Sequence, residues 1–149
     1  MTNGNATYQE RNSVETNVGE ERFLAYCESK GATVHRLGFD EKRGKVARFF
    51  SLPDTVRLLP DFVVENDNKI VLVEVKGSAN FKRRDYDRID WLVSQFTNAQ
   101  TMLVFAFALP DGIEWLTPGE VKEFFEASTH EGVWPDGVEY RTLNFGGAS

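Results

Sequence analysis

The chain has 149 residues, of which 41% are hydrophobic and 13% aromatic, and this is enough to build one compact core. Its single cysteine excludes an internal disulfide, and no apolar run approaches the roughly twenty residues that a membrane-spanning helix needs. With no recognisable secretory leader at its start, the sequence predicts a soluble protein of the cytoplasm.

The net charge of −6 is unevenly distributed. Residues 101–149 contain two basic and eight acidic residues, so this segment alone carries a charge equal to that of the whole chain. Residues 32–60, in contrast, contain six basic and three acidic residues. The overall acidity therefore does not exclude a nucleic-acid partner that binds the basic segments.

The N-terminal segment 1–17 is predicted to be a flexible arm, because it is rich in Asn and Thr and lacks a sustained periodicity. A helix over 18–30 follows. Its apolar residues have the spacing of one helix face: Phe23, Leu24 and Cys27. Glu20 lies at the end of this stripe and is a candidate site residue. The alternative is that Glu20 only caps the helix, as an acid in the first turn does.

A strand at about 32–38 precedes a basic loop over 39–52. Four cations of this loop are followed by two aromatic residues: Lys42, Arg43, Lys45, Arg48, Phe49 and Phe50. Cations beside aromatic rings can hold the phosphates of a nucleic acid and stack on its bases. A solvated loop anchored by two core phenylalanines explains the pattern equally well, so both interpretations stay open.

Two apolar runs over 58–65 and 70–76 flank a turn-forming Asn/Asp cluster and predict a β-hairpin. If the turn is centred on this cluster, Asp61 lies opposite Glu74, and alternation places Lys76 on the same face. Two facing carboxylates in a largely dry place repel each other unless a cation or a shared proton relieves the repulsion. A divalent cation between them is therefore predicted, with an ion-paired trio on an exposed strand as the alternative.

Oxygen ligands without a Cys/His cluster favour Mg²⁺ or Mn²⁺ over zinc at this site. Such an ion, held by Asp61 and Glu74, would lower the pKa of a bound water and polarise a phosphoryl oxygen. The Lys76 ammonium would orient or activate that water, or stabilise the charge that builds up on a phosphate. The three residues together thus predict a site for hydrolysis of a phosphate ester.

More cations follow the hairpin: Lys82, Arg83, Arg84 and Arg88. The first three come soon after the strand that carries the motif, where they would pass near the scissile phosphate. Arg88 lies on a polar flank of the next helix and could grip a nucleic-acid strand. These four residues are therefore candidates for nucleic-acid binding.

A helix is predicted over 85–98, followed by two strands at 101–109 and 113–116. A further helix at 118–128 and a last strand or packed tail at 138–145 then precede a flexible tail at 146–149. The strand at 101–109 is apolar on both faces and is expected in the interior of a sheet that is covered on two sides. This order predicts one α/β domain over 18–145 with a mixed sheet.

Pro60-Asp61 followed by Glu74-Val75-Lys76, with an acid on a preceding helix, resembles the PD-(D/E)XK nuclease superfamily, in particular small Holliday-junction-resolvase-like or phage-type endonucleases. The likeness covers about residues 18–110. It implies the restriction-endonuclease-like fold, a three-layer α/β/α sandwich with a central mixed sheet. It also implies a metal-dependent phosphodiesterase, without a particular substrate. We expect a Mg²⁺- or Mn²⁺-dependent endodeoxyribonuclease that acts on DNA, in which Asp61 and Glu74 hold the metal. By analogy with the family, the Val75 carbonyl is a third ligand, and Glu20 binds metal through water or a second ion.

Other functions remain compatible with the same residues. The fold also occurs as a non-catalytic module that binds nucleic acid or protein, and the acidic C-terminal third would then be a docking surface. If the substrate is a four-way junction, two active sites are needed, and the protein would be a homodimer.

Overall fold

The computed structural model describes residues 8–37, 58–66 and 69–146, with side chains from residue 18 onward except that of Asn66. These ranges do not include the basic-loop residues Lys42, Arg43, Lys45 and Arg48, so the structure does not test their predicted role. In chain order the elements are α1 (Tyr8–Ser29), β1 (Val34–Arg36), β2 (Phe62–Asn66), β3 (Lys69–Lys76), β4 (Asn80–Lys82), α3 (Arg83–Phe96), β5 (Thr101–Leu109), β6 (Gly112–Leu116), α4 (Pro118–Ala127), β7 (Glu131–Val133) and β8 (Glu139–Thr142).

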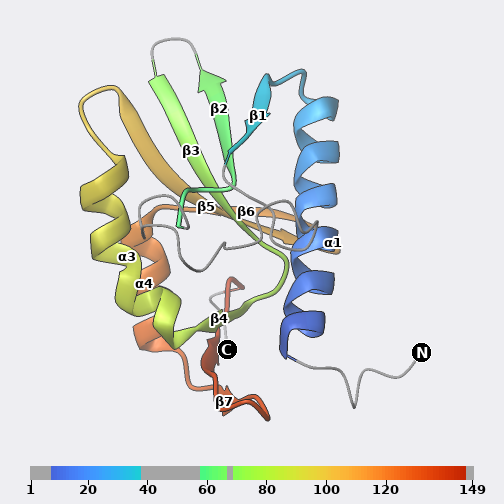
Figure 1. Cartoon of the computed structure of the whole chain (residues 1–149), viewed down its shortest axis with the longest axis vertical. Coiled ribbons are helices and arrows are strands. Elements are labelled where there is room, and N and C mark those ends of the chain that lie inside the picture. The colour runs from blue at the N-terminus through green and yellow to red at the C-terminus, as the bar shows by residue number, and fades with distance from the viewer. Residues whose placement is uncertain (1–7, 38–57, 67–68, 147–149) are drawn as a thin grey trace, which may run out of the picture.

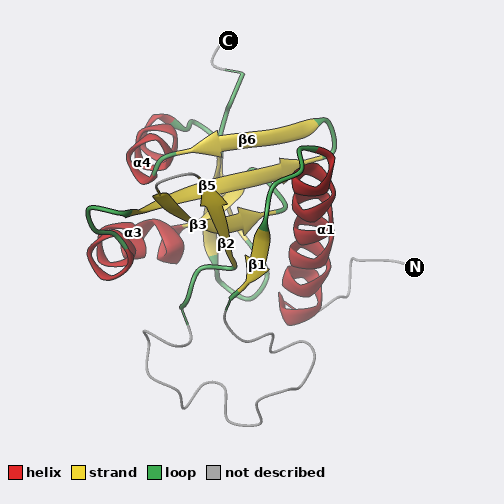
Figure 2. Ribbon diagram, turned by 90° about the horizontal axis from the view of Figure 1, so that it is seen from above, coloured by secondary structure: helices red, strands yellow, loops and turns green. Residues whose placement is uncertain are grey.

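Five strands form a mixed sheet in the order β1-β2-β3-β5-β6. The β3–β5 pair is parallel, and the other three pairs are antiparallel. Figure 1 and Figure 2 show α1 on one side of the sheet and α3 with α4 on the other. The described part of the chain is therefore an α/β fold with three helices around a mixed sheet, as the element order predicted.

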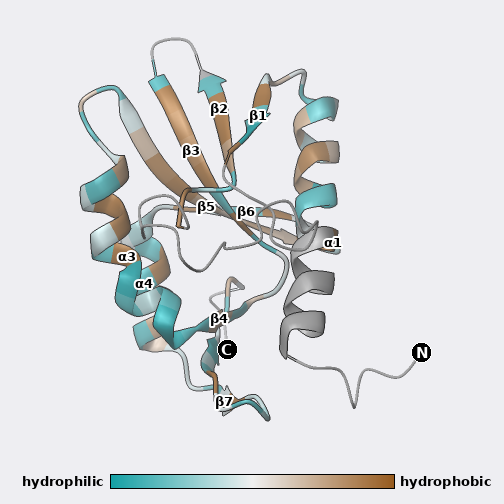
Figure 3. Ribbon diagram, in the orientation of Figure 1, coloured by the Kyte–Doolittle hydropathy of each residue, from teal (hydrophilic) through white to brown (hydrophobic). Residues whose placement is uncertain are grey.

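Strand β5 is buried on both faces because its side chains alternate between two cores. The even-numbered residues of 104–108 pack against α1 around Phe23. The odd-numbered Phe105 and Phe107 pack against α3 and α4 around Phe125. The prediction of an interior strand covered on two sides is thus confirmed, and Figure 3 shows the hydrophobic colour on β3 and on part of β5, between helices that carry both hydrophilic and hydrophobic residues.

Strands β2 and β3 form the predicted hairpin in the predicted register, with Phe62 opposite Val73. Both of these residues belong to the core beneath α1. Because side chains alternate along a strand, Glu74 and Lys76 point to the opposite face, toward α3. Asp61 precedes β2 but stays attached to β3, since its N–H donates to the Val73 carbonyl at 3.0 Å.

Helix α1 differs from the prediction in two respects. It begins at Tyr8, so residues 8–17 of the expected arm are helical, while residues 1–7 lie outside the described ranges. A helix can extend beyond its apolar stripe because each added residue gains a backbone hydrogen bond without a new nucleation step. In addition, Leu24 is 37% exposed, so the buried stripe of the helix consists of Phe23 and Cys27.

A small second sheet in the order β4-β8-β7 lies beside α3 and α4. The predicted strand or tail at 138–145 contains β8, whereas β4 and β7 are three-residue strands that were not predicted. Strands this short contain too few residues for an alternation pattern, and they form because a partner strand is brought alongside. No helix in the described ranges is both long and apolar enough to cross a membrane.

Candidate active site

Asp61, Glu74 and Lys76 line one cavity on the side of the sheet that α3 covers. The cavity has a volume of about 160 Å³. Its wall is formed by Leu58, Leu59, Asp61, Glu74, Lys76, Asp85, Arg88, Leu92 and Phe105. Charged groups therefore face one another here between apolar side chains, where electrostatic interactions are stronger than in water.

Asp61 is held in place by the backbone of the neighbouring strand. Its Oδ2 accepts a hydrogen bond from the N–H of Val75 at 2.8 Å. The preceding Pro60 is fully buried and has no N–H, so its backbone nitrogen needs no acceptor where the chain enters the sheet. The two halves of the motif, Pro60-Asp61 and Glu74-Val75-Lys76, are thus joined by a direct hydrogen bond.

Burial raises the pKa of two of the three carboxyls in the cavity wall, Asp61 and Glu74. For Asp61, burial outweighs the Val75 hydrogen bond and the nearby Lys76 ammonium, and the pKa rises to about 6. For Glu74, burial and then repulsion by the Asp61 carboxylate raise the pKa well above its usual range. Both charges are therefore incompletely compensated by the protein, which is the condition that a bound divalent cation would relieve.

Lys76 points to helix α3 and forms an ion pair there. Its Nζ donates to Asp85 Oδ2 at 3.1 Å and lies 5.5 Å from the centre of the Phe81 ring. Burial opposes the charge of this ammonium, but the carboxylates of Asp85, Glu74 and Asp61 outweigh burial and raise its pKa. The metal-free site therefore favours the charged form of Lys76.

Glu20 lies near the cavity but does not line it. Its side chain is 12% exposed, and its Oε1 accepts from Arg36 Nη1 at 2.5 Å. It still contributes, after burial and other neighbours, to the raised pKa of Asp61 and Glu74. Glu20 is thus part of the electrostatic environment, with Arg36 as its partner in this structure.

The close approach of α1 to the end of β3 depends on two glycines. A Cβ atom at Gly19 would lie 2.7 Å from the Cα of Gly77, a distance that Cβ atoms do not tolerate. Gly77 directly follows Lys76 in the chain. The absence of a side chain at residue 19 therefore allows the helix turn with Glu20 to pack beside the motif.

The donor set fits a magnesium-type ion. No group of three His, Cys, Asp or Glu side chains that could hold a metal occurs within the ranges 8–37, 58–66 and 69–146. Mg²⁺, however, is usually held by one or two carboxylates together with waters and substrate phosphates. Asp61 and Glu74 meet this requirement, and Glu20 would join them only by leaving Arg36.

The predicted nucleic-acid-binding cations fall in different places. Arg88 lines the cavity. Lys82 ends β4, and Arg83 and Arg84 begin α3, where both arginines are exposed. Of these four residues, Arg88 is the one that lines the cavity together with Asp61 and Glu74.

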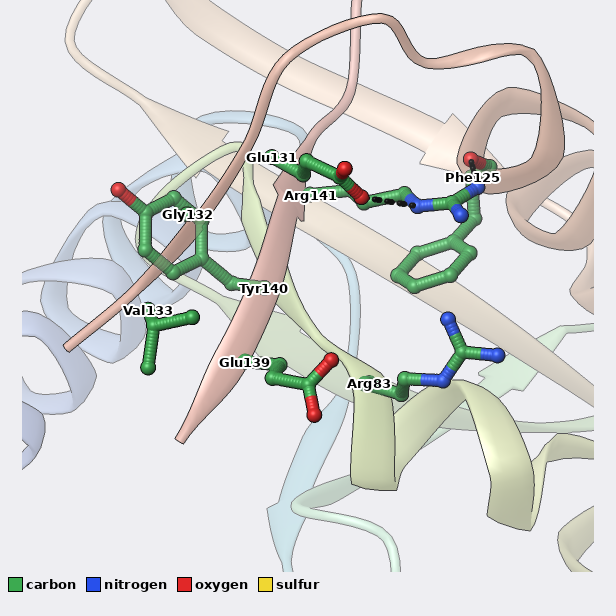
Figure 4. Close-up of a pocket in the computed structure, with 8 residues that line it drawn as sticks. All are labelled: Arg83, Phe125, Glu131, Gly132, Val133, Glu139, Tyr140 and Arg141. Carbon is green, nitrogen blue, oxygen red and sulfur yellow. Dashed lines mark hydrogen bonds and ion pairs between the residues drawn. The ribbon is translucent and has the colours of Figure 1, made fainter. Parts of the chain in front are cut away.

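A larger cavity lies away from the motif, between the small sheet and the first turn of α3 (Figure 4). It has a volume of about 260 Å³ and is lined by Arg83, Phe125, Glu131, Gly132, Val133, Glu139, Tyr140 and Arg141. Its two arginines are matched by two glutamates, and Arg141 Nε already lies 3.6 Å from Glu131 Oε2. The larger cavity thus lacks the uncompensated carboxylate pair, so chemistry rather than size identifies the candidate site.

Two residues of the site were not foreseen from the sequence. Asp85 lies in the first turn of α3, where an acid is explained by the helix dipole alone. Arg36 lies on a short strand with no motif around it. Their pairing with Lys76 and Glu20 becomes visible only when the helices are packed on the sheet.

No protein-family model matches the chain, and no curated protein matches it either. The geometry and charge of the cavity are therefore the basis for a functional assignment.

Proposed function

We propose that the protein is a Mg²⁺- or Mn²⁺-dependent nuclease that hydrolyses phosphodiester bonds in DNA. The observation that carries this proposal is the pairing of Asp61 and Glu74 in one cavity, both with a raised pKa, beside the Lys76 ammonium. The restriction-endonuclease-like fold is part of the proposal. Its support is the mixed sheet with helices on both sides and the position of the motif on the hairpin.

In this proposal Asp61 and Glu74 hold the ion, with the Val75 carbonyl and Glu20 as additional ligands that the family resemblance implies. When bound, the ion supplies Lewis acidity to a water and a phosphoryl oxygen. The hairpin supplies rigidity, because the Val75 N–H fixes the Asp61 carboxylate. A site held by strand backbone keeps its ligands in place more accurately than a site on loops.

Lys76 contributes positive charge rather than proton abstraction, because its pKa is raised. An ammonium directed at a developing negative charge in a water-poor cavity stabilises the transition state. Arg88 adds a planar guanidinium on the wall formed by α3, suited to two-point binding of a phosphate. In this proposal Lys76 and Arg88 bind the phosphate, and Asp61 and Glu74 bind the metal.

The test is a cleavage assay on supercoiled, linear duplex, flap, four-way-junction and single-stranded DNA, in Mg²⁺, in Mn²⁺ and in a chelator. We expect metal-dependent cleavage that falls by about 10²- to 10³-fold in Asp61→Asn and in Lys76→Ala. The matched control is Lys69→Ala, which removes an exposed lysine from the other end of β3 and should retain full activity. Circular dichroism should be the same for all variants.

Full activity of both cavity variants would overturn the proposal. DNA binding without cleavage by the unmodified protein, in either metal, would identify the chain as the non-catalytic module instead. Measuring the oligomeric state beside the junction assay decides whether a homodimer accompanies cleavage of branched DNA.

A further inference from the structure

We propose that Asp85 is a positioning residue that holds the Lys76 ammonium away from Asp61 and Glu74, and so keeps the metal position between the two carboxylates open. This inference rests on the proposed nuclease function and adds a residue to the site. Asp85 acts through Lys76 and is not itself placed as a ligand or a base.

The contact between the two residues is direct and sheltered. Lys76 Nζ and Asp85 Oδ2 are 3.1 Å apart, and the two side chains are only 26% and 24% exposed. Beneath the ammonium lies the Phe81 ring, which is 1% exposed. Ion pairs with this degree of shielding are held more firmly than those on the open surface.

Asp85 is well anchored for this task. It lies in the first turn of α3, which is fixed to the sheet by the buried side chains of Ile89 and Leu92. A carboxylate at a helix N-terminus is also favoured by the helix dipole. Because α3 cannot move freely, the position of the Asp85 carboxylate determines the direction in which Lys76 points.

The alternative partners of Lys76 are the metal-binding carboxylates themselves. Asp61 and Glu74 line the same cavity as Lys76, but within the described ranges no ion pair joins either of them to Nζ. If the charge of Asp85 were removed, these two carboxylates would be the remaining acids of the cavity wall. The flexible lysine would then turn toward them and take the place of a divalent cation.

The experiment compares Mn²⁺ binding by calorimetry in the unmodified protein, Asp85→Asn, Asp85→Glu and the double variant Asp85→Asn/Lys76→Ala. Loss of groups that orient a metal site typically weakens metal binding about 10- to 100-fold, and we expect Asp85→Asn to do so. Asp85→Glu should recover part of the affinity. The double variant should recover it fully, because the competing ammonium is gone.

The control variant is Asp90→Asn on the same helix. It removes a lysine–aspartate pair of similar length, 3.0 Å to Lys122, on the side of α3 that faces α4. Mn²⁺ affinity should not change. In cleavage assays at saturating Mn²⁺, Asp85→Asn should still lose roughly 10- to 100-fold in kcat with little change in KM for DNA, because Lys76 is misplaced.

Two results would overturn the inference. Unchanged Mn²⁺ affinity in Asp85→Asn would show that the pair does not protect the site. Weakened affinity that the added Lys76→Ala fails to restore would show that Asp85 acts by its own charge. Failure of the nuclease proposal is recognised separately, since the unmodified protein would then neither bind Mn²⁺ nor cleave DNA. In that event, crystal structures of the metal-free proteins still test whether Nζ moves to Glu74 in Asp85→Asn.

Discussion

The carboxylate of Asp61 accepts a hydrogen bond from the backbone N–H of Val75 at 2.8 Å, across a sequence separation of 14 residues. The position of the Asp61 carboxylate, a candidate metal ligand, thus depends directly on Val75, the residue between Glu74 and Lys76. A slip of the hairpin by one residue would turn Glu74 and Lys76 into the core beneath α1. The register of the hairpin therefore controls both the packing of the sheet and the composition of the site.

Replacement of Glu74 by Gln should stabilise the metal-free protein at pH 7.5, because it removes a charge whose burial and repulsion by Asp61 are unfavourable. We expect an increase on the order of 1 kcal/mol in the free energy of unfolding, or about 2–4 °C in Tm. Mn²⁺ should raise the Tm of the unmodified protein and have much less effect on the variant. Thermal unfolding with and without Mn²⁺ provides the measurement.

The control for this experiment is Glu114→Gln on β6, where the carboxylate is exposed. Its Tm should change little in either condition. A lower Tm for Glu74→Gln in the absence of metal would mean that Glu74 is stabilised by a partner that the structure does not show.

Metal binding should weaken as the pH falls below about 6. The pKa of Asp61 is about 6 in the folded protein and 3.8 for an ordinary aspartate, so the folded state binds this proton more tightly than the unfolded state. Protonation of Asp61 therefore contributes stability that is present at low pH and is lost as the pH rises from about 4 to 6.

The same proton competes with the metal, since a ligand carboxylate must be ionised. Displacement of the Asp61 proton alone should lower Mn²⁺ affinity about tenfold for each pH unit below the pKa of Asp61. The raised pKa of Glu74 adds a second proton for the ion to displace and makes the fall steeper. Calorimetry at pH 5, 6 and 7.5 gives the profile. An affinity that is constant over this interval would contradict the placement of the ion at Asp61.

The pair of Glu20 and Arg36 should be strongly coupled in a double-mutant cycle. Arg36→Ala leaves the sheltered Glu20 carboxylate without its partner and should destabilise the fold by about 1–3 kcal/mol. The Arg36 guanidinium also lies 5.0 Å from the Phe62 ring, and the cycle separates this packing contribution from the ion pair. Glu20→Gln/Arg36→Ala should therefore be less destabilised than the sum of the single variants.

The exposed pair Asp90–Lys122 is the reference for this cycle, because the aspartate is 83% exposed. Its coupling energy should be about 0–0.5 kcal/mol, as for surface pairs in general. Equal coupling energies for the two pairs, measured by urea unfolding, would contradict the conclusion that the Glu20–Arg36 pair is more sheltered, and therefore stronger, than a surface pair.

Gly19→Ala should lower both stability and cleavage, because the new methyl group would meet the Gly77 backbone at 2.7 Å and push α1 away from the motif. Overpacking of this kind typically costs about 1–3 kcal/mol. Gly119→Ala in the first turn of α4 is the matched control, since its Cβ would find its nearest neighbour at 3.9 Å. Tm and initial cleavage rate should be reduced only in the first variant.

Local pattern was sufficient for much of the fold. The alternation of side chains in 58–65 and 70–76, with turn residues between them, predicted the hairpin and its register. The length and two-sided apolarity of 101–109 predicted an interior strand. Both predictions succeed because periodicity along a strand reflects which faces are buried, and that information is local. The same reasoning failed for residues 8–17, where a helix continues without an apolar stripe to mark it.

The candidate site was also predictable only in part. Asp61, Glu74 and Lys76 were predicted to share a face from sequence alone, because the hairpin register relates all three. The partners Asp85 and Arg36 were decided by tertiary structure, since each lies on an element whose position relative to the hairpin depends on how the cores pack. Tertiary packing also kept Glu20 beside the cavity and Arg83 outside it. Charges become neighbours through the docking of helices on the sheet, and the pKa shifts that distinguish this site follow from that docking rather than from spacing along the chain.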